Sequence, residues 1–225
     1  MRTGRAPNRA DMRERGDDWT EPFIAAMHRN AALRAPLVVG AVGADRVQRL
    51  LDIGGGSGAY AIAFARANPA LRAEVFDLAT VVPIARRHIA EAGLADRVQT
   101  RVGDLRTDAF GSGYDLVLLS AICHMLGPDE NRGLLRRAHE ALGPGGRIVV
   151  QDHVMNAGKT APRSGALFAI NMLVGTPAGG TDSEDEYAAW LREAGFTRVH
   201  HVSLAGPNDL MMAERPAPAG SSPSV

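Results

Sequence analysis

The run from Leu50 to Tyr60, LLDIGGGSGAY, constrains the fold of this chain more than any other segment. An apolar stretch typical of a buried strand passes through Asp52, and four of the five residues at 54–58 are glycine. Glycine adopts the backbone angles of tight turns and lets a ligand approach the main chain. A helix expected over 59–67 would present its free N–H groups to the same ligand. The segment predicts a strand, a glycine loop and a helix that bind a nucleotide-like molecule.

The rest of the chain alternates between strand and helix patterns. The expected strands are 48–53, 72–76, 98–102, 116–120, 147–151, 198–202 and 209–213, and the expected helices are 59–67, 81–92, 129–142, 164–174 and 183–194. The early strands are short apolar runs, typical of a parallel sheet covered on both faces. Only a short turn separates the last two strands, which indicates an antiparallel pair at the sheet edge. The pattern predicts an α/β fold, a doubly wound Rossmann-like sheet of seven strands that ends in an antiparallel hairpin.

Composition limits the remaining choices. The chain has 225 residues, 45% of them apolar, and zero formal net charge, which gives no reason to expect nucleic acid as a partner. No apolar run approaches a membrane span. The single cysteine, Cys123, and the lack of a secretory signal predict a cytoplasmic protein. We expect a disordered lead-in over 1–17, a helical segment over 18–45, a ligand-binding domain over 46–215 and a disordered tail over 216–225.

Polar residues lie at the carboxyl ends of the first five predicted strands. They are Asp52, Asp77, Asp104, the segment 120–124, and Asp152. Ligands bind such sheets beyond the carboxyl ends of the strands. The sequence therefore predicts that these residues line one crevice.

The glycine spacing leaves the ligand open between two classes. Gly54, Gly56 and Ala59 match the dinucleotide pattern G-x-G-x-x-A, and Asp77 follows at about the ribose-binding distance. The acidic residues Asp52 and Asp104 favour the cationic S-adenosylmethionine over a diphosphate, which they would repel. A glycine turn without a ligand, a helix N-cap at Asp77 and a simple turn at Asp104 are the structural alternatives.

His124 is the candidate general base. It is expected in a loop after a strand, and an imidazole with an ordinary pKa of about 6.5 can accept a hydroxyl proton at neutral pH. Asp152 would orient it through a hydrogen bond. A structural histidine and an aspartate that caps its strand are the alternatives. Cys123 is expected to be buried and inert, and without HExxH, paired cysteines or close carboxylates we expect no metal.

Four of these motifs carry a resemblance to a known family. Residues 51–58 (LDIGGGSG), 76–78 (FDL), 103–104 (GD) and 122–124 (ICH) resemble the S-adenosylmethionine-dependent O-methyltransferases of the plant caffeate/acetylserotonin type and their bacterial natural-product relatives. The resemblance extends from Trp19 to Pro216, and residues 143–146 (GPGG) match it as a turn before the fifth strand. It implies a class I methyltransferase domain that converts S-adenosylmethionine to S-adenosylhomocysteine without a metal. The implied acceptor is a hydroxyl of a small aromatic or polyketide-like molecule.

The resemblance also implies roles for individual residues. The cofactor would be held at the methionine part by the glycine loop, at the ribose by Asp77 and at the adenine by Asp104 and Leu105. The full implied cofactor set is Asp52, Gly54, Gly55, Gly56, Gly58, Asp77, Leu78, Gly103, Asp104, Leu105 and Ser120. His124 would be the catalytic base, with Asp152 as a flanking acid. The implied acceptor pocket contains Phe23, Met27, Asn171 and Met172.

The chain departs from the family in several places. Ser120 stands where plant members have a lysine, and Met125 where they have an aspartate. A second acid beside the histidine has no clear match, and Asp182 and Glu184 are the nearest residues. Family members also carry an N-terminal winged-helix dimerisation domain, so we expect here the catalytic domain alone, with a homodimer or a partner chain supplying that domain. Rival functions are a non-methylating relative that hydroxylates or decarboxylates, a non-catalytic binding partner, and, least favoured, a nicotinamide oxidoreductase.

Overall fold

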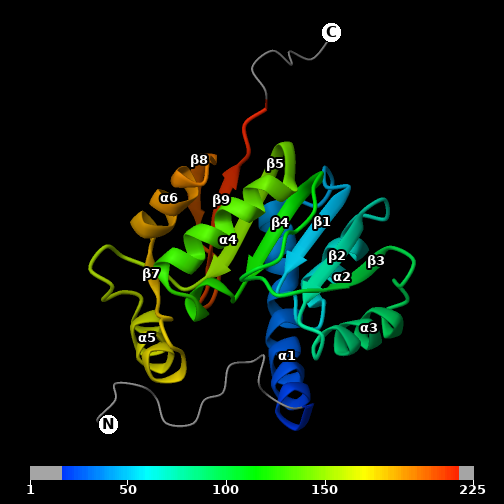
Figure 1. The fold of residues 1–225 in the computed structure, drawn as a ribbon, viewed down its shortest axis with the longest axis horizontal. Helices are drawn as coiled ribbons and strands as arrows, with labels where there is room; N and C mark the ends of the chain where they lie inside the picture. The colour runs from blue at the N-terminus through cyan, green and yellow to red at the C-terminus, as the bar shows by residue number, and fades with distance from the viewer. Residues whose placement is uncertain (1–16, 218–225) are drawn as a thin grey trace.

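Seven strands form one mixed sheet in the protein, which we describe from a computed structural model of residues 17–217 (Figure 1). The spatial order is β3-β2-β1-β4-β5-β9-β8. The strands are β1 Arg49–Ile53, β2 Arg72–Asp77, β3 Val98–Val102, β4 Tyr114–Ser120, β5 Leu142–Asp152, β8 Thr197–Val202 and β9 Asp209–Glu214. The first five are parallel, and β9 is antiparallel to both β5 and β8. This confirms the predicted doubly wound sheet and its terminal hairpin.

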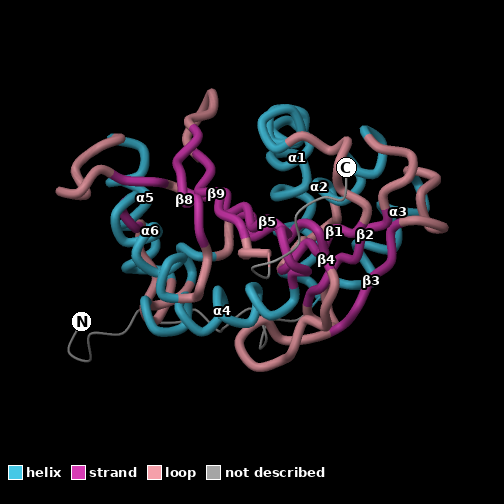
Figure 2. The backbone as a smooth tube through the Cα atoms, turned by 90° about the horizontal axis from the view of Figure 1, so that it is seen from above, coloured by secondary structure: helices cyan, strands magenta, loops and turns pink. Residues whose placement is uncertain are grey.

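Helices cover both faces of the sheet (Figure 2). One apolar core joins α1 (Asp17–Val42), α2 (Ala59–Ala67) and α3 (Val82–Glu91) to the sheet, and the other joins α4 (Pro128–Ala141) and α6 (Glu184–Glu193) to its opposite face. Val38 and Val42 of α1 are buried in the first core beside Phe64 of α2. The helical segment expected over 18–45 is therefore one helix that packs on the sheet. The disorder predicted for 1–17 and 216–225 falls outside the described residues, except that Asp17 begins α1 and residues 216 and 217 carry no helix or strand.

The GPGG segment at 143–146 is not the turn that the sequence predicted. It belongs to β5, because the Gly145 N–H donates to the carbonyl of Arg215 at 2.9 Å and the Arg215 N–H donates to the carbonyl of Gly146 at 2.7 Å. Pairing with the chain after β9 thus extends the strand beyond its apolar part. The sequence also gave no sign of the parallel pair β6 (Val154–Met155) and β7 (Asp182–Ser183), since two residues are too few to show a period of two.

Parallel pairing places the ends of the first five strands at one edge. Ile53 lies beside Phe76 and Leu119, and Ser120 lies beside Gln151. Two helices, α1 and α5 (Arg163–Gly175), extend beyond this carboxyl edge in Figure 1. The polar residues predicted at the strand ends therefore lie along this one edge.

Candidate active site

The glycine loop (residues 54–58) depends on glycine for its backbone. Gly54, Gly56 and Gly58 have φ of +66°, +57° and +77°, a region that disfavours other residues. At two of these positions a side chain would also collide or crowd: a Cβ on Gly54 would lie 2.4 Å from Cδ1 of Ile122, and one on Gly58 3.3 Å from Val75. At Gly56 the nearest atom to such a Cβ is 3.9 Å away, on Ile24. Gly56 is thus the loop position with open space beside the main chain.

Two further glycines of the predicted cofactor set have a packing reason for their identity. A Cβ on Gly103 would lie 2.2 Å from Cζ of Phe76, and one on Gly55 would lie 2.7 Å from Cγ of Asp52. These contacts are inside the protein. They explain the glycines without a ligand, which the sequence pattern did not distinguish.

Asp52 is a buried carboxyl group whose hydrogen bonds are unmade among the described residues. It is 0% exposed, and neither of its oxygens has a hydrogen-bond partner. Burial, reinforced by the charge of Asp77, raises the pKa of Asp52 to about 7; the nearby Ala61 N–H, outside hydrogen-bond geometry, partly opposes the shift. Buried polar groups are normally paired. A cationic or amino group at this place would satisfy the carboxylate.

Asp77 holds the glycine loop in place from the next strand. Its Oδ2 accepts a hydrogen bond from the Gly56 N–H at 2.8 Å, and its Oδ1 accepts one from the Leu78 N–H at 2.7 Å. Burial raises the pKa of Asp77 to about 6 in spite of these two hydrogen bonds. The N-cap alternative is wrong, because α3 has Val81 at its N-cap position with no side-chain bond.

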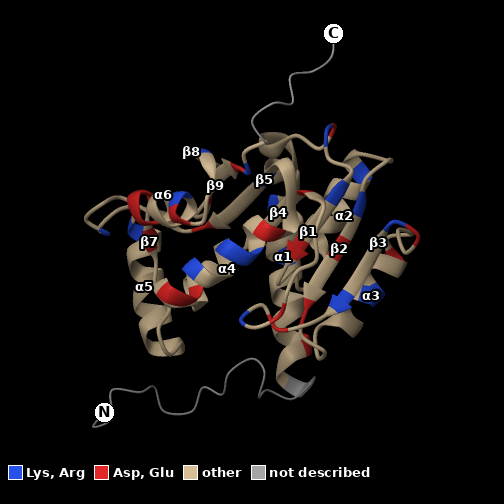
Figure 3. Ribbon diagram, turned by 45° about the horizontal axis from the view of Figure 1, so that its top comes forward, with Lys and Arg blue, Asp and Glu red and all other residues tan. Residues whose placement is uncertain are grey.

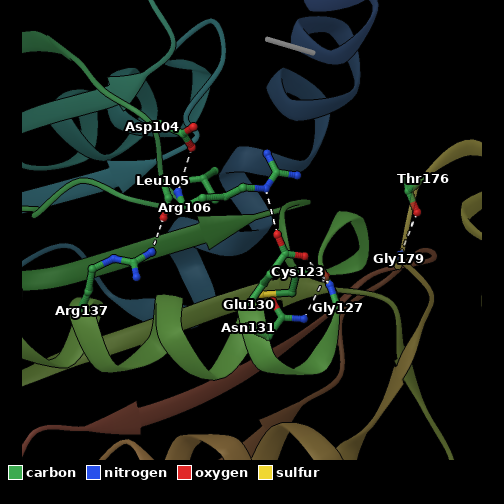
Figure 4. A network of polar contacts seen from close by, with 10 residues as sticks. All are labelled: Asp104, Leu105, Arg106, Cys123, Gly127, Glu130, Asn131, Arg137, Thr176 and Gly179. Carbon is green, nitrogen blue, oxygen red and sulfur yellow. Dashed lines mark hydrogen bonds and ion pairs between the residues drawn. The ribbon is translucent and has the colours of Figure 1, made fainter. Parts of the chain in front are cut away.

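The turn at 103–108 is joined to the end of β4 through α4 (Figure 4). The Arg106 N–H donates to Oδ1 of Asp104 at 2.8 Å, the local bond that the turn alternative predicted. The Arg106 Nε donates to Oε1 of Glu130 at 3.0 Å, and Oε2 of Glu130 accepts the Gly127 N–H at 3.0 Å. Arg137 donates to the Leu105 carbonyl. The predicted adenine turn and the loop that carries His124 are therefore connected by side-chain hydrogen bonds.

His124 and Asp152 form a buried pair, as the sequence predicted. The two Nδ1–Oδ distances are 2.8 and 3.1 Å, and the Asp152 carboxylate also accepts the His124 N–H at 3.2 Å and the His153 N–H at 2.8 Å. Burial alone would raise the pKa of Asp152, but the attraction of His124 and these hydrogen bonds outweigh it and lower the pKa. A carboxylate only accepts, so Nδ1 of His124 carries a proton in this pair, and Nε2 is the nitrogen that holds the lone pair whenever the ring is neutral.

The histidine loop (residues 122–127) is also fixed through its backbone. The His124 carbonyl accepts the Gly180 N–H at 3.0 Å, and the Cys123 carbonyl accepts Nδ2 of Asn131 at 3.1 Å. A Cβ on Gly179 would lie 2.3 Å from the His124 carbonyl oxygen. The Gly179 N–H donates to Oγ1 of Thr176 at 2.8 Å (Figure 4). The connection between α5 and β7 therefore packs directly on the backbone of His124.

One aromatic neighbour of His124, Phe168, was missed by the sequence reasoning. The Phe168 ring of α5 meets the His124 ring edge to face at 4.9 Å and lies 4.3 Å from the ring of His153. His153 is 8% exposed, and its Nδ1 has no partner among the described residues. Phe168 precedes Asn171 and Met172 by one helical turn, so helical spacing could have identified it.

The remaining predicted residues, Ser120 and the four expected in the acceptor pocket, differ in exposure and in their contacts. The Ser120 hydroxyl is already used, since it donates to Oε1 of Gln151 at 2.8 Å. Met172 is buried and Asn171 exposed on α5, while Phe23 stacks on Trp19 at 4.6 Å on α1. Met27, also on α1, is 39% exposed.

The two candidates for a second acid differ in their surroundings. Asp182 is buried and pairs with Lys159 at 3.4 Å. Burial raises the pKa of Asp182 to about 6, and the charge of Asp152 adds to the rise, whereas Glu184 pairs with His201 at 3.0 Å. Asp182 is the one of the two that lies toward the histidine loop.

Among the described residues, we find no second candidate site. One surface hollow is lined by His139, Gly195 and Arg215 and another by Arg46, Asp115 and Arg147, and both lie at the amino ends of the strands, away from these residues. The residues that the structure describes contain no group of three potential metal ligands. In this part of the chain, no helix is both long and apolar enough to cross a bilayer.

Comparisons with known proteins agree with this geometry. An O-methyltransferase domain family matches residues 5–197. The chain is 36% identical to a 3-hydroxy-5-methyl-1-naphthoate 3-O-methyltransferase of Streptomyces sahachiroi over 83% of its own length and 54% of that protein's. It is 37% identical to an L-tyrosine C(3)-methyltransferase of Streptomyces lavendulae over 66% and 41% of the two chains. It is 32% identical to the acetylserotonin O-methyltransferase of Mus musculus over 88% of its own length and 52% of that protein's.

A solved structure shows the same fold together with a cofactor product. The structure described as PigF with SAH superposes with a TM-score of 0.81 at 29% identity, over 88% of this chain and 59% of that one. This chain spans about half the length of the curated relatives that it matches. Its family match covers most of its sequence, and it belongs to the O-methyltransferase domain family of S-adenosylmethionine-dependent enzymes.

Proposed function

We propose that this protein transfers the methyl group of S-adenosylmethionine to a hydroxyl of a small aromatic or polyketide-like molecule, with His124 as the general base. The observation that carries the proposal is the position of the His124–Asp152 pair. It lies at the same carboxyl edge of the sheet as the glycine loop, Asp52 and Asp77. Donor and base are thus expected at one edge, where ligands of such sheets bind.

The residues at this edge fit S-adenosylmethionine. The unpartnered Asp52 carboxylate suits the amino group of the methionine part, and the open main chain at Gly56 allows close approach. Asp77 retains acceptor capacity for ribose hydroxyls beside its two backbone bonds. Leu78, Asp104 and Leu105 would complete the ribose and adenine contacts. Gly54, Gly55, Gly58 and Gly103 support the loop and turn, and Ser120 acts through Gln151.

His124 would remove the acceptor proton through Nε2. Asp152 keeps the proton on Nδ1 and stabilises the imidazolium that forms, as carboxylates do beside catalytic histidines. The bound cofactor supplies an activated methyl group, so the protein's main contribution is alignment. Phe168 would limit the position of the acceptor beside the imidazole, with Phe23, Met27, Asn171 and Met172 as further pocket residues.

The test is methyl transfer from labelled S-adenosylmethionine to a panel of phenolic acceptors. The wild type is expected to methylate at least one acceptor, and His124→Ala to lose about 100-fold or more of the turnover, within the usual contribution of a general base. His124→Ala should still bind S-adenosylhomocysteine. The exposed His200→Ala variant is the matched control. Binding without transfer to any acceptor would favour a non-methylating relative or a binding partner.

A second candidate is methylation at carbon. It rests on the similarity to the L-tyrosine C(3)-methyltransferase, whose name gives a carbon of tyrosine as the methyl acceptor. In that reaction His124 would deprotonate the phenol and raise the electron density of the neighbouring ring carbon. Nuclear magnetic resonance of the product distinguishes an O-methyl from a C-methyl group.

We also propose that α1 and α5 contact a second copy or a partner chain. Leu33 on α1 is 79% exposed and Leu173 on α5 is 75% exposed, and α5 carries a single charged residue, Arg163 (Figure 3). Each helix thus presents exposed apolar side chains, a feature of interaction surfaces. Light scattering should show association that Leu173→Glu weakens, while a monomer at all concentrations would contradict the proposed contact.

The free, buried Cys123 agrees with the proposed cytoplasmic location.

A further inference from the structure

A histidine of α1 forms a side-chain hydrogen bond with the glycine loop. Nδ1 of His28 lies 2.8 Å from Oγ of Ser57. Ile24, one helical turn before His28, is the residue nearest to the open position at Gly56. Helix α1 therefore meets the loop through two side chains on the same face.

Ser57 is the one residue of the loop that the protein can hold by a side chain. The loop sequence is Gly-Gly-Gly-Ser-Gly, so its other four positions have no side chain. Ser57 is 4% exposed and lies between Gly56 and Gly58, both at positive φ. Glycine has the largest backbone freedom to lose on ordering. The Ser57 hydroxyl is consequently the natural place to restrain this loop.

His28 is itself held in a fixed orientation. Its ring stacks on the ring of His88 of α3, with centroids 4.1 Å apart and planes inclined by 10°. Burial, and after it the charge of His88, lower the pKa of His28, while Glu91 opposes them. A neutral His28 can either accept from or donate to Ser57, according to its tautomer.

We propose that His28 is a positioning residue for cofactor binding, which holds the glycine loop through Ser57 in the conformation that receives the methionine part of S-adenosylmethionine. The inference rests on the proposed placement of the cofactor at this loop. A loop ordered in advance loses less conformational entropy when the ligand binds. Removing the hydrogen bond between His28 and Ser57 should therefore weaken cofactor binding more than it lowers the stability of the fold.

Calorimetric titration with S-adenosylhomocysteine tests the proposal. His28→Ala and Ser57→Ala are each expected to weaken binding about 10-fold, and the double variant no further, because both remove one interaction. His28→Asn should restore much of the affinity, since an Asn side chain places a polar atom where His has Nδ1. His28→Gln, which reaches past that position, should not. Asn30→Ala, exposed on the same helix, is the control.

The outcomes separate the two levels of the argument. Wild-type affinity in His28→Ala, additive losses in the double variant, or equal affinities for the Asn and Ala variants would each overturn the role of His28. Absence of binding by the wild type would instead overturn the proposed cofactor site, and this inference with it. Thermal melting of the unliganded variants provides the second readout, and it should differ little from wild type.

Discussion

Nδ1 of His124 lies 2.8 Å from Oδ1 of Asp152, and both side chains are almost entirely enclosed. The pair joins the loop after β4 to the end of β5 and holds Nδ1, not Nε2, against the carboxylate. Because the carboxylate also accepts the backbone N–H groups of His124 and His153, it cannot turn away without losing several bonds. The orientation of the proposed base is thus set by the sheet.

Replacing Asp152 by Asn should reduce turnover strongly. The Asn NH₂ group would face one of the N–H donors that now meet the carboxylate, and the imidazolium would lose its counter-charge. We expect a fall of about 100-fold or more in turnover, with little change in affinity for S-adenosylhomocysteine. Steady-state kinetics and calorimetry measure the two effects. Asp129→Asn, at a fully exposed carboxylate, is the control, and a turnover near wild type for Asp152→Asn argues against the pair.

Replacing Asp52 by Asn should stabilise the unliganded protein at neutral pH and weaken cofactor binding. The pKa of Asp52 rises from its unfolded value, 3.8, to about 7 on folding, so ionisation opposes folding as the pH rises through that range. The stability advantage of Asn should grow from about pH 4 to about pH 7 and then level off. It should amount to several degrees of melting temperature, at about 2–4 °C per kcal/mol.

Thermal melting across this pH range measures the effect of Asp52→Asn. Asp45→Asn, at an exposed carboxylate, is the matched control and should show no such trend. An Asn advantage that is constant with pH would contradict the burial argument.

Gly179 should not accept a side chain, whereas its neighbour should. An Ala Cβ at 179 would lie 2.3 Å from the His124 carbonyl oxygen, while at Gly180 nothing lies within 4 Å. We expect Gly179→Ala to cost about 1–3 kcal/mol of stability, the usual range for overpacking. Turnover should fall further, because the displaced group is the backbone of His124. Equal behaviour of the 179 and 180 variants in melting and activity assays would show that this contact is unimportant.

Phe168→Ala should impair acceptor use and leave the cofactor site intact. The ring contacts both His124 and His153, and an aromatic pair of this kind contributes about 0.5–1.5 kcal/mol. We expect a KM for the acceptor raised about 3- to 10-fold, with unchanged S-adenosylhomocysteine affinity. Leu167→Ala, one residue away and 59% exposed, serves as the reference. A loss of cofactor affinity in Phe168→Ala would contradict the assignment of this ring to the acceptor pocket.

The fold class follows from the amino-acid pattern alone, because short apolar strands alternating with helices leave few arrangements open. The glycine loop and the polar strand ends were predictable in the same way, since parallel strands bring those ends to one edge. Contacts between residues far apart in the chain could be found only in the folded structure. Examples are the extension of β5 through its backbone hydrogen bonds with Arg215, the packing of Phe76 against Gly103, and the hydrogen bond between His28 and Ser57. Such contacts have no local period or spacing, because they arise only when the elements pack.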